Sequence, residues 1–422
     1  MPRFNITRRK ALLILASAVI VVVGVLQFAK LAEDRTLLRP YDFVEYWTTG
    51  RLLLDGANPY DPDRLVPMQK AMHDGVAKAV MMWNPPWTLA LVVPFASLPW
   101  RLAQFLWLAV QMGALLVSAD LLWRMYGGPL RYRWVAFAIA LTFAPSLFLL
   151  LMGQISGLPL LGLVCFLWFL RNDRLILAGC LASMTAIKPH HLALFALILF
   201  LEGLRHTSIR KAIAAGAVVL LIGSILPLLW NSHVWNDYHA ATRRGPSETF
   251  DSMEEFEHST IGYQLRLLLP GKPFAAQFIP LLLAAIATIV WWRRDVRRVS
   301  DPPNSLSDHS ASGRSSDNWR WERNMPLLVL ISMLATPYGA WAFDKVLLLI
   351  VLIPMAVRVI HSRNKPLIAF AAGLFVLLNL LTLETIRNAG SQANPWIAPA
   401  VLVGYIATSS IATRNRSETG SE

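Results

Sequence analysis

The chain has 422 residues, of which 55% are hydrophobic and only 15% charged, and its mean hydropathy is +0.47. A soluble domain of this size needs more polar surface than this composition supplies, so the excess apolar residues are expected to face lipid. The formal net charge of +13 does not indicate a nucleic-acid partner, because basic residues are expected in cytoplasmic loops, where they orient a membrane protein and meet anionic lipid.

Apolar runs of roughly 17–25 residues predict membrane-spanning helices. The first, from Ala11 to Phe28, follows three basic residues at 8–10. This pattern is also compatible with a cleaved signal peptide, but the length and the Val-rich composition favour a retained anchor. Seven further ordinary runs lie at 102–123, 134–152, 156–170, 212–230, 274–292, 366–382 and 396–412.

In two regions a polar turn interrupts an apolar run, and each apolar half is long enough for only a short helix of roughly 16–22 Å. Basic residues flank both regions on both sides, so each is predicted to be a pair of short helices whose ends lie in the cytoplasm and whose turn points outward. Eight ordinary spans and two such pairs predict an all-α polytopic membrane protein with about 12 transmembrane helices. The halves and turns are Leu175–Ile187, Lys188-Pro189-His190-His191 and Leu192–Leu204, then Met325–Ala335, Thr336-Pro337-Tyr338-Gly339 and Val346–Ile360.

The span count divides the chain into membrane and loop segments. A cytoplasmic N-terminus (1–10), a transmembrane domain (11–412) and a cytoplasmic tail (413–422) are expected in the cytoplasmic (inner) membrane, with both termini inside. A flexible cytoplasmic loop is expected at 293–324 because it is rich in Ser, Asp and Arg. Two long outer loops lie at 31–101 and 231–273.

The first outer loop is expected to be structured. Apolar and aromatic residues recur at three-to-four spacing over 42–54, which predicts an amphipathic helix at the membrane surface. The apolar run 87–98 is too short to span comfortably and is interpreted as a re-entrant or interfacial segment. The two cysteines both fall in apolar helices, which argues against a disulfide framework or a metal site.

Polar residues of several types are predicted to gather at the outer face, where ionisable groups at membrane depth are functional candidates by default. Each also has a structural explanation. Asp42 could cap a helix, Lys188 could snorkel to the interface, the histidines could form a polar turn, and Asp344 with Lys345 could neutralise each other. The candidates are Asp42, Glu45, Gln154, Lys188, His190, His191, Tyr338 and Asp344.

Together with these residues, an ordered set of motifs resembles glycosyltransferase family 87, whose members use polyprenol-phosphate-mannose. The set covers roughly residues 40–360, and the sequence differs from the mannosyltransferase members where those carry Ser-Pro-x-x-Trp followed by histidines. The motifs are Asp42-Phe43-x-x-Tyr46-Trp47 continuing to Gly56-Ala57-Asn58-Pro59-Tyr60-Asp61, Asn84-Pro85-Pro86, Gly153-Gln154, Ala186-Ile187-Lys188-Pro189, and Thr336-Pro337-Tyr338-Gly339 with Asp344.

The resemblance implies a GT-C-like fold with its active site on the outer face. It also implies a polyprenyl-phosphate sugar donor, mannose above other hexoses, and a catalytic acidic residue at the position of Asp42. The chemistry of such a transfer agrees: a carboxylate can act as general base toward a lipid or glycan acceptor, and one displacement inverts the anomeric carbon.

The other candidates receive roles from the same chemistry. Cations at this depth would bind the anionic donor phosphate, for which Lys188, His190 and His191 are predicted. Sugar or acceptor contacts are expected from Glu45, Trp47, Tyr60, Gln154, Tyr338 and Asp344. No cofactor is predicted beyond the lipid-linked donor and surrounding membrane lipid, and a loosely bound divalent metal stays open.

Two other functions compete with this one. A twelve-span secondary transporter also uses broken helices near a binding site, although the halves of this chain show no visible repeat. A flippase or scaffold could bind lipid-linked sugars without transferring them.

Overall fold

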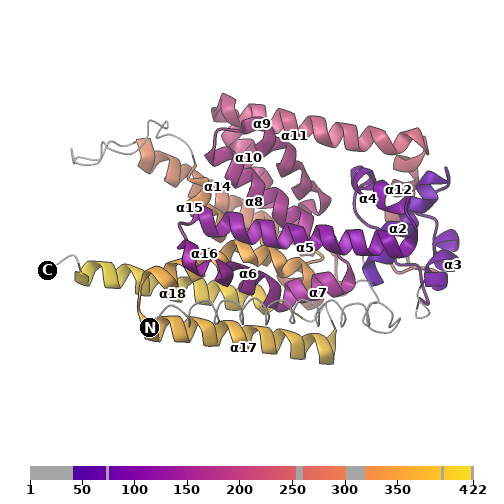
Figure 1. Cartoon of the computed structure of the whole chain (residues 1–422). Helices are drawn as coiled ribbons and strands as arrows, with labels where there is room; N and C mark the ends of the chain where they lie inside the picture. The colour runs from indigo at the N-terminus through magenta and orange to yellow at the C-terminus, as the bar shows by residue number, and fades with distance from the viewer. Residues whose placement is uncertain (1–40, 73–75, 253–259, 301–318, 391–393, 420–422) are drawn as a thin grey trace, which may run out of the picture.

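The computed structural model describes residues 41–72, 76–252, 260–300, 319–390 and 394–419 (Figure 1). Within these ranges the regular elements are helices and none is a strand, which confirms the predicted all-α class for the described part of the chain. The predicted N-terminal segment 1–10 and the predicted first span, 11–28, lie outside the described residues.

Four helical stretches in the described ranges are long and apolar enough to cross a membrane. They are α5 (Trp100–Met125), α11 with η5 (Thr207–Leu229), η6 with most of α14 (Phe274–Val296), and α17 (Lys365–Ala389). Two further helices pass the same criterion only as one bent pair, Leu130–Thr142 with Ala144–Met152. Length and composition therefore indicate a membrane protein with four or five such spans in the described ranges, and the total of 12 stays a prediction.

The predicted span 134–152 is broken in two. Helices α6 (Arg133–Thr142) and α7 (Ala144–Met152) meet at Phe143 with a bend of 55°. Pro145 is the cause, because it cannot donate a backbone hydrogen bond and its ring clashes with the preceding turn. The backbone N–H of Ala144 donates instead to Asn379 Oδ1 of α17, at 2.5 Å.

The first predicted helix pair doubles back as expected. Its arms are α9 with η3 (Leu175–Ala182, Ser183–Ile187) and η4 with α10 (Pro189–Leu192, Ala193–Arg205). Gly179 of α9 and Gly203 of α10 both pack against the first half of α11, at Ala212 and Ile213. The turn lies at the opposite end of α11, because Trp87 packs against Gly223 near that end and its Nε1 donates to the carbonyl of Ala186 at 3.0 Å.

The second predicted pair has the same form. It consists of α15 (Trp321–Ala335) and η7 with α16 (Ala342–Leu348, Leu349–His361). Glu322 at the start of α15 and Arg358 near the end of α16 both lie beside Tyr126, at the end of α5. The turn between the arms contacts the turn of the first pair through Thr336, whose Oγ1 donates to the His190 carbonyl at 3.2 Å. The two polar turns therefore meet.

A helical cap covers the bundle at the end where the two turns lie (Figure 1). The first predicted outer loop supplies α2 (Tyr41–Leu54), α3 (Pro62–Met72), η1 (Pro86–Thr88) and α4 (Leu89–Ala96). The second outer loop supplies α12 (Val234–Arg243) and α13 (Ile261–Leu268).

Helix α2 is buried on most sides, whereas an amphipathic surface helix would keep one face exposed. The reason is its position between α4, α3 and α5, where Phe43 and Tyr46 pack on Trp107. Helix α4 has eight residues and is thus about 12 Å long, too short to span a membrane.

The predicted cytoplasmic loop 293–324 is helical at both ends. Helix α14 (Ile279–Ser300) runs into its start, and α15 begins at Trp321. Asn324 Nδ2 donates to Asp295 Oδ2 at 2.9 Å and ties these ends together, while 301–318 lie outside the described residues. Helix α18 (Ile397–Thr419) likewise extends into the predicted tail 413–422.

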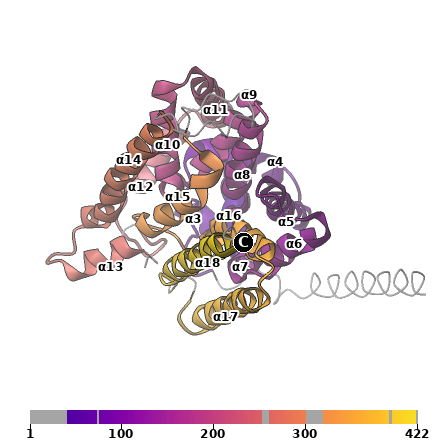
Figure 2. The same cartoon turned by 90° about the vertical axis from the view of Figure 1, so that its left-hand side faces the viewer.

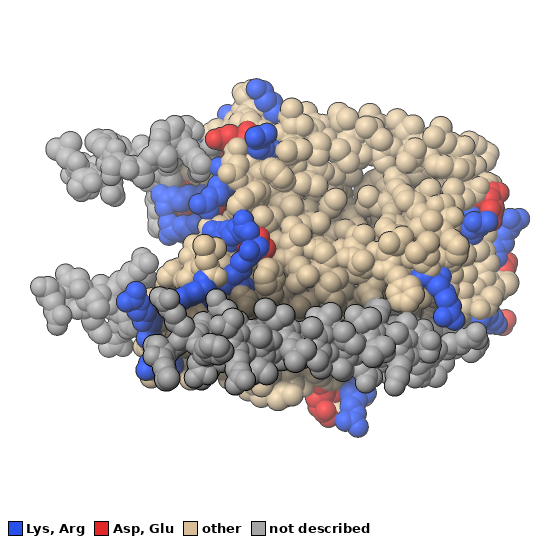
Figure 3. Space-filling view, viewed as in Figure 1, with Lys and Arg blue, Asp and Glu red and all other residues tan. Residues whose placement is uncertain are grey.

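The bundle has inner and outer helices. Viewed along its length, α8 (Gly157–Arg171) and α16 lie inside, whereas α11, α14 and α17 lie outside (Figure 2). The inner helices are mostly buried, and the outer ones expose many large apolar side chains. Charged side chains gather at the two ends of the visible face, and the wide band between carries few (Figure 3). This distribution is typical of a protein whose sides face lipid.

Candidate functional site

A cavity of about 430 Å³ lies between the cap and the two turns. Its walls come from the start of α2, the segment 78–85 of the first outer loop, the residues after α7, and both turns. Eight of the ten sequence-predicted site residues line it: Asp42, Glu45, Gln154, Lys188, His190, His191, Tyr338 and Asp344. Residues separated by some 300 positions in the chain thus share one chamber.

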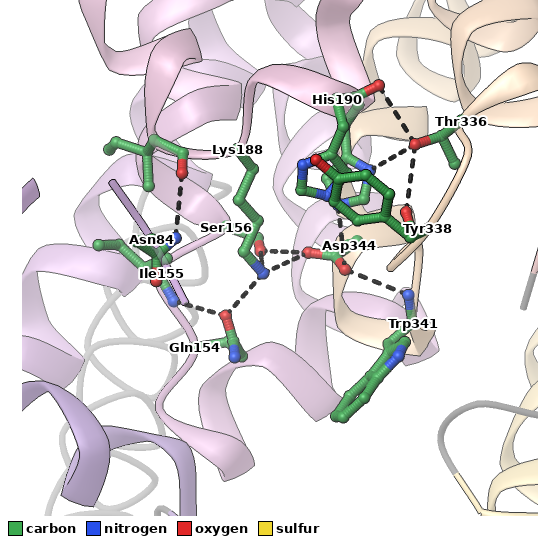
Figure 4. Close-up of polar contacts among 12 residues, drawn as sticks. Asn84, Gln154, Ile155, Ser156, Lys188, His190, Thr336, Tyr338, Trp341 and Asp344 are labelled. Atoms are coloured by element: carbon green, nitrogen blue, oxygen red, sulfur yellow. Dashed lines mark hydrogen bonds and ion pairs between the residues drawn. The ribbon is translucent and has the colours of Figure 1, made fainter. Parts of the chain in front are cut away.

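Lys188 lies at the centre of a polar cluster in the wall (Figure 4). Its Nζ donates to Asp344 Oδ1 at 2.7 Å, and to Gln154 Oε1 and Ser156 Oγ at 3.0 Å each. An ammonium group has three N–H donors, so each of them has a protein acceptor here. The side chains of Lys188 and Asp344 are 12% and 3% exposed, so this is a buried ion pair.

Asp344 is held from every side of its carboxylate. Ser156 Oγ donates to Oδ1 at 2.6 Å, the backbone N–H of Trp341 donates to Oδ2 at 3.1 Å, and His191 Nε2 lies 3.2 Å from Oδ2. Burial alone would raise the pKa of Asp344, but the charge of Lys188 and the hydrogen bonds from Lys188 and His191 hold it well below its usual value. Asp344 is therefore an ionised anchor for the turn of the first helix pair.

The two histidines differ in environment. His191 is buried, and its Nδ1 lies 3.3 Å from Thr336 Oγ1. Burial lowers the pKa of His191 and Asp344 opposes this shift only in part, which favours the neutral imidazole. The ring of His190 packs on that of Tyr338, with centroids 4.3 Å apart, and His190 is only partly buried.

Gly339 makes this packing possible. Its φ is +67°, a region that costs other residues energy, and an added Cβ would lie 3.0 Å from His190 Nε2. The Thr336-Pro337-Tyr338-Gly339 turn therefore brings its backbone against both histidine rings in a way that needs glycine.

Asp42 and Glu45 lie one helical turn apart on α2, and both are buried where they line the cavity. Asp42 Oδ2 accepts a hydrogen bond from Gln154 Nε2 at 2.9 Å. Burial raises the pKa of Asp42 to about 6, although Gln154 and Lys188 oppose the rise. Burial and the neighbouring Asp42 raise the pKa of Glu45 well above its usual value. A carboxyl whose pKa lies near neutral pH is suited to accept a proton.

Two predicted contact residues lie outside the cavity wall. Trp47 Nε1 donates to the carbonyl of Leu98 at 3.1 Å, and its ring packs edge-on against Trp100. Tyr60 is buried beneath Tyr238 in the cap. Both residues join pieces of the cap to each other, and the described cavity lining does not include them.

Several residues that line the cavity or support its wall were given no role by the sequence patterns. Ser156 lies two positions after Gln154, and that proximity is a signal that could have identified it. Asn84 Nδ2 donates to the carbonyl of Ile187 at 3.0 Å, which joins its Asn-Pro-Pro motif to the Lys188 turn. Lys78 and Asp251 form an ion pair of 2.6 Å between the two outer loops. Their pairing across 173 positions leaves no local pattern.

A metal site is not apparent in the part of the chain that the structure describes: no three or more His, Cys, Asp or Glu side chains there are grouped to hold an ion.

A comparison with family models matches residues 83–313, more than half of the chain, to a family described as glycosyltransferase family 87. Gln154, Lys188, His190 and His191 lie within the match, whereas Asp42, Glu45 and Asp344 lie outside it. No curated protein and no solved structure matches the chain significantly.

Proposed function

Because the chain belongs to glycosyltransferase family 87 and is a membrane glycosyltransferase, we propose that its donor is a polyprenyl-phosphate hexose, with mannose as the sugar. The sugar passes to a hydroxyl of a lipid or glycan acceptor at the outer face of the cytoplasmic membrane. The observation that carries this proposal is the cavity itself, which the buried carboxylate of Asp42 and the Lys188–Asp344 ion pair line together. Family membership favours transfer over the secondary transporter.

Asp42 acts as the general base in the proposed reaction. The acceptor hydroxyl gives its proton to the Asp42 carboxylate while its oxygen attacks the anomeric carbon of the donor sugar. The bond between that carbon and the phosphate oxygen breaks, and polyprenyl phosphate leaves with the bonding electrons. A single displacement inverts the anomeric carbon. No cofactor is part of the proposal. Mannose transfer measured with and without EDTA tests for a loosely bound divalent metal.

The turn of the first helix pair stabilises the leaving phosphate. His190 and Lys188 line the same cavity as Asp42, and a positive charge in a poorly solvated wall favours an anion placed against it. The three donors of Lys188 already have protein acceptors, so its charge acts through space until the phosphate replaces one of them. Tyr338, packed on His190, offers the ring face on which a sugar can stack.

The decisive assay is transfer of radiolabelled mannose from polyprenyl-phosphate-mannose to cell-envelope lipid and glycan fractions by purified protein in nanodiscs. Asp42→Asn is expected to lower the rate by roughly 10²–10⁴-fold, the usual contribution of a general base. Asp55→Asn is the matched control, because Asp55 directly follows the same helix, pairs with Arg51 at 3.7 Å and lies outside the cavity lining. No transfer by the wild type from any polyprenyl-phosphate hexose would refute the proposal, and full activity of Asp42→Asn would move the base to Glu45 or Asp344.

The proposed orientation places the cap outside the cell. In intact cells, a membrane-impermeant maleimide is expected to label Arg244→Cys in the cap and to leave Arg210→Cys, at the start of α11, unlabelled. Both positions are exposed, and Cys165 and Cys180 are replaced by serine in both variants so that no other thiol reacts. The opposite labelling pattern would place the cavity in the cytoplasm and contradict an outer active site.

A further inference from the structure

The side chain of Gln154 connects the proposed base to the cationic cluster. Its Nε2 donates to Asp42 Oδ2 at 2.9 Å, and its Oε1 accepts from Lys188 Nζ and from the Tyr46 hydroxyl at 3.0 Å each. The backbone N–H of Ile155 donates to the same Oε1 at 3.1 Å. Because three donors surround the oxygen, the amide cannot be reversed, and its N–H must face Asp42.

The backbone that carries Gln154 is also held in place. Gly153 ends α7 in the left-handed conformation, with φ of 68°, and its carbonyl accepts from Trp107 Nε1 at 2.7 Å. Trp107 is itself buried in the aromatic cluster that packs α2 on α5. The glutamine therefore starts from a fixed point and ends on the carboxylate of Asp42.

From these contacts we propose that Gln154 is a positioning residue, which holds the Asp42 carboxylate in the orientation that accepts the acceptor's proton and is itself polarised by Lys188. This inference rests on the proposed function of Asp42. It differs from a direct contact of Gln154 with sugar or acceptor, the role that the sequence predicts. Occupation of Oδ2 by the amide N–H directs the other carboxylate oxygen to the substrate hydroxyl.

The electrostatic consequence can be measured. An amide N–H that donates to a carboxylate stabilises its ionised form, and the charge of Lys188 on Oε1 strengthens the donor. The titratable or charged groups that share the cavity with Asp42 are Tyr41, Glu45, Tyr46, Lys78, Lys188, His190, His191, Tyr238, Asp251, Tyr338 and Asp344. The burial that raises the pKa of Asp42 is opposed first by Gln154 and then by Lys188, so loss of the glutamine amide should raise that pKa further.

The test measures Asp42 itself as well as turnover. A hydrophobic carbodiimide reacts with protonated carboxyls, so the pH midpoint of its labelling of Asp42, followed by mass spectrometry, reports protonation without any substrate. Gln154→Met is expected to raise this midpoint by about one pH unit, since a hydrogen bond to a charged group is worth about 1.5 kcal/mol. The pKa on the acid side of the kcat/KM profile should shift upward by the same amount. At neutral pH, kcat should be about 100-fold lower, and KM for the donor should change little.

Two controls separate positioning from packing. Gln111→Met replaces another fully buried glutamine, on α5, whose amide has no hydrogen-bond partner among the described residues, and it should leave both curves unchanged. Tyr46→Phe removes a donor to Oε1 but keeps the bond from Gln154 to Asp42, so the midpoint should stay within a few tenths of a unit. Gln154→Asn, which withdraws the amide by one carbon, should shift the midpoint upward and covers the case in which Gln154→Met does not fold.

The outcomes distinguish the two proposals. An unchanged labelling midpoint in Gln154→Met and Gln154→Asn overturns the positioning role, even if Asp42→Asn abolishes transfer. A raised midpoint in a protein that transfers no sugar supports the link between Gln154 and Asp42 and removes the proposed function instead.

Discussion

Replacement of Lys188 by methionine should destabilise the protein far more than loss of a surface charge would. The variant leaves the Asp344 carboxylate, only 3% exposed, without its ion-pair partner. Breaking a buried pair in this way typically costs about 3–5 kcal/mol. Ser156 and the Trp341 backbone still donate to the carboxylate, so we expect the lower end of that range.

The charge left behind is the reason for this cost, and a double variant tests it. Lys188→Met combined with Asp344→Asn removes both charges and should recover more than half of the lost free energy of unfolding. Lys78→Met is the matched control: the pair of Lys78 with Asp251 has a similar length, 2.6 Å, but both side chains are more than 40% exposed. Its loss should cost at most about 1 kcal/mol.

The same variant should show a characteristic dependence on pH. In the wild type, Lys188 and His191 lower the pKa of Asp344, so the pair's contribution is present at neutral pH and is lost as pH falls through the folded-state pKa. Without Lys188, the buried carboxylate gains a proton more readily, and His191 loses a repulsive neighbour. The gap in stability between wild type and Lys188→Met should therefore be larger at pH 8 than at pH 5.

Unfolding of the purified protein by SDS, followed by tryptophan fluorescence, measures these free energies. A single variant within about 1 kcal/mol of the wild type, or a double variant no more stable than the single one, would refute the buried-pair reasoning.

Three further predictions follow from the same structure. Sugar transfer by the wild type should fall as pH drops through about 6, because the Asp42 carboxyl must be ionised to act as base and its pKa is raised to about 6; a rate that is flat from pH 5 to 8 would contradict this role. Gly339→Ala should cost about 1–2 kcal/mol in stability because of the positive φ at this position, and should lower transfer by displacing the histidines. In thermal melts the control Gly373→Ala, whose added Cβ meets open space, should be neutral or slightly stabilising. Gly179→Ala should lower the free energy of unfolding by about 1–3 kcal/mol or more, and with it the expression yield, since the added Cβ would lie 1.9 Å from the Ala212 carbonyl oxygen. A melting temperature equal to that of the wild type would show that α9 and α11 can separate.

Length, hydropathy and charge in the sequence determined much of the architecture. Apolar runs located most of the bundle helices that the structure describes, because a lipid-facing helix needs an uninterrupted apolar stretch. They did not locate α3, α12 and α13 of the cap. Flanking basic residues placed the Lys188 and Tyr338 turns at one end of the molecule, since both flanks of each region belong to the same side. That common placement is why Lys188 and Asp344 could be predicted to share a site.

Other features depend on contacts between distant segments. The bend at Phe143 was missed because Pro145 alone does not decide whether a membrane helix continues, and a partner such as Asn379 is needed for the freed N–H. Trp47 and Tyr60 carry the residue type for sugar stacking, yet packing within the cap uses their rings.

The tertiary structure also decided what the polar residues do. The sequence places Asp42, Gln154, Lys188 and Asp344 at the same end of the protein, but it contains no information on which atoms meet. Only the packing of α2 against α7 and the two turns orders them into a chain from the base, through an amide, to a neutralised lysine. Hydrogen bonds depend on tenths of an ångström, whereas apolar periodicity and charge bias specify only the end of the bundle at which a residue lies.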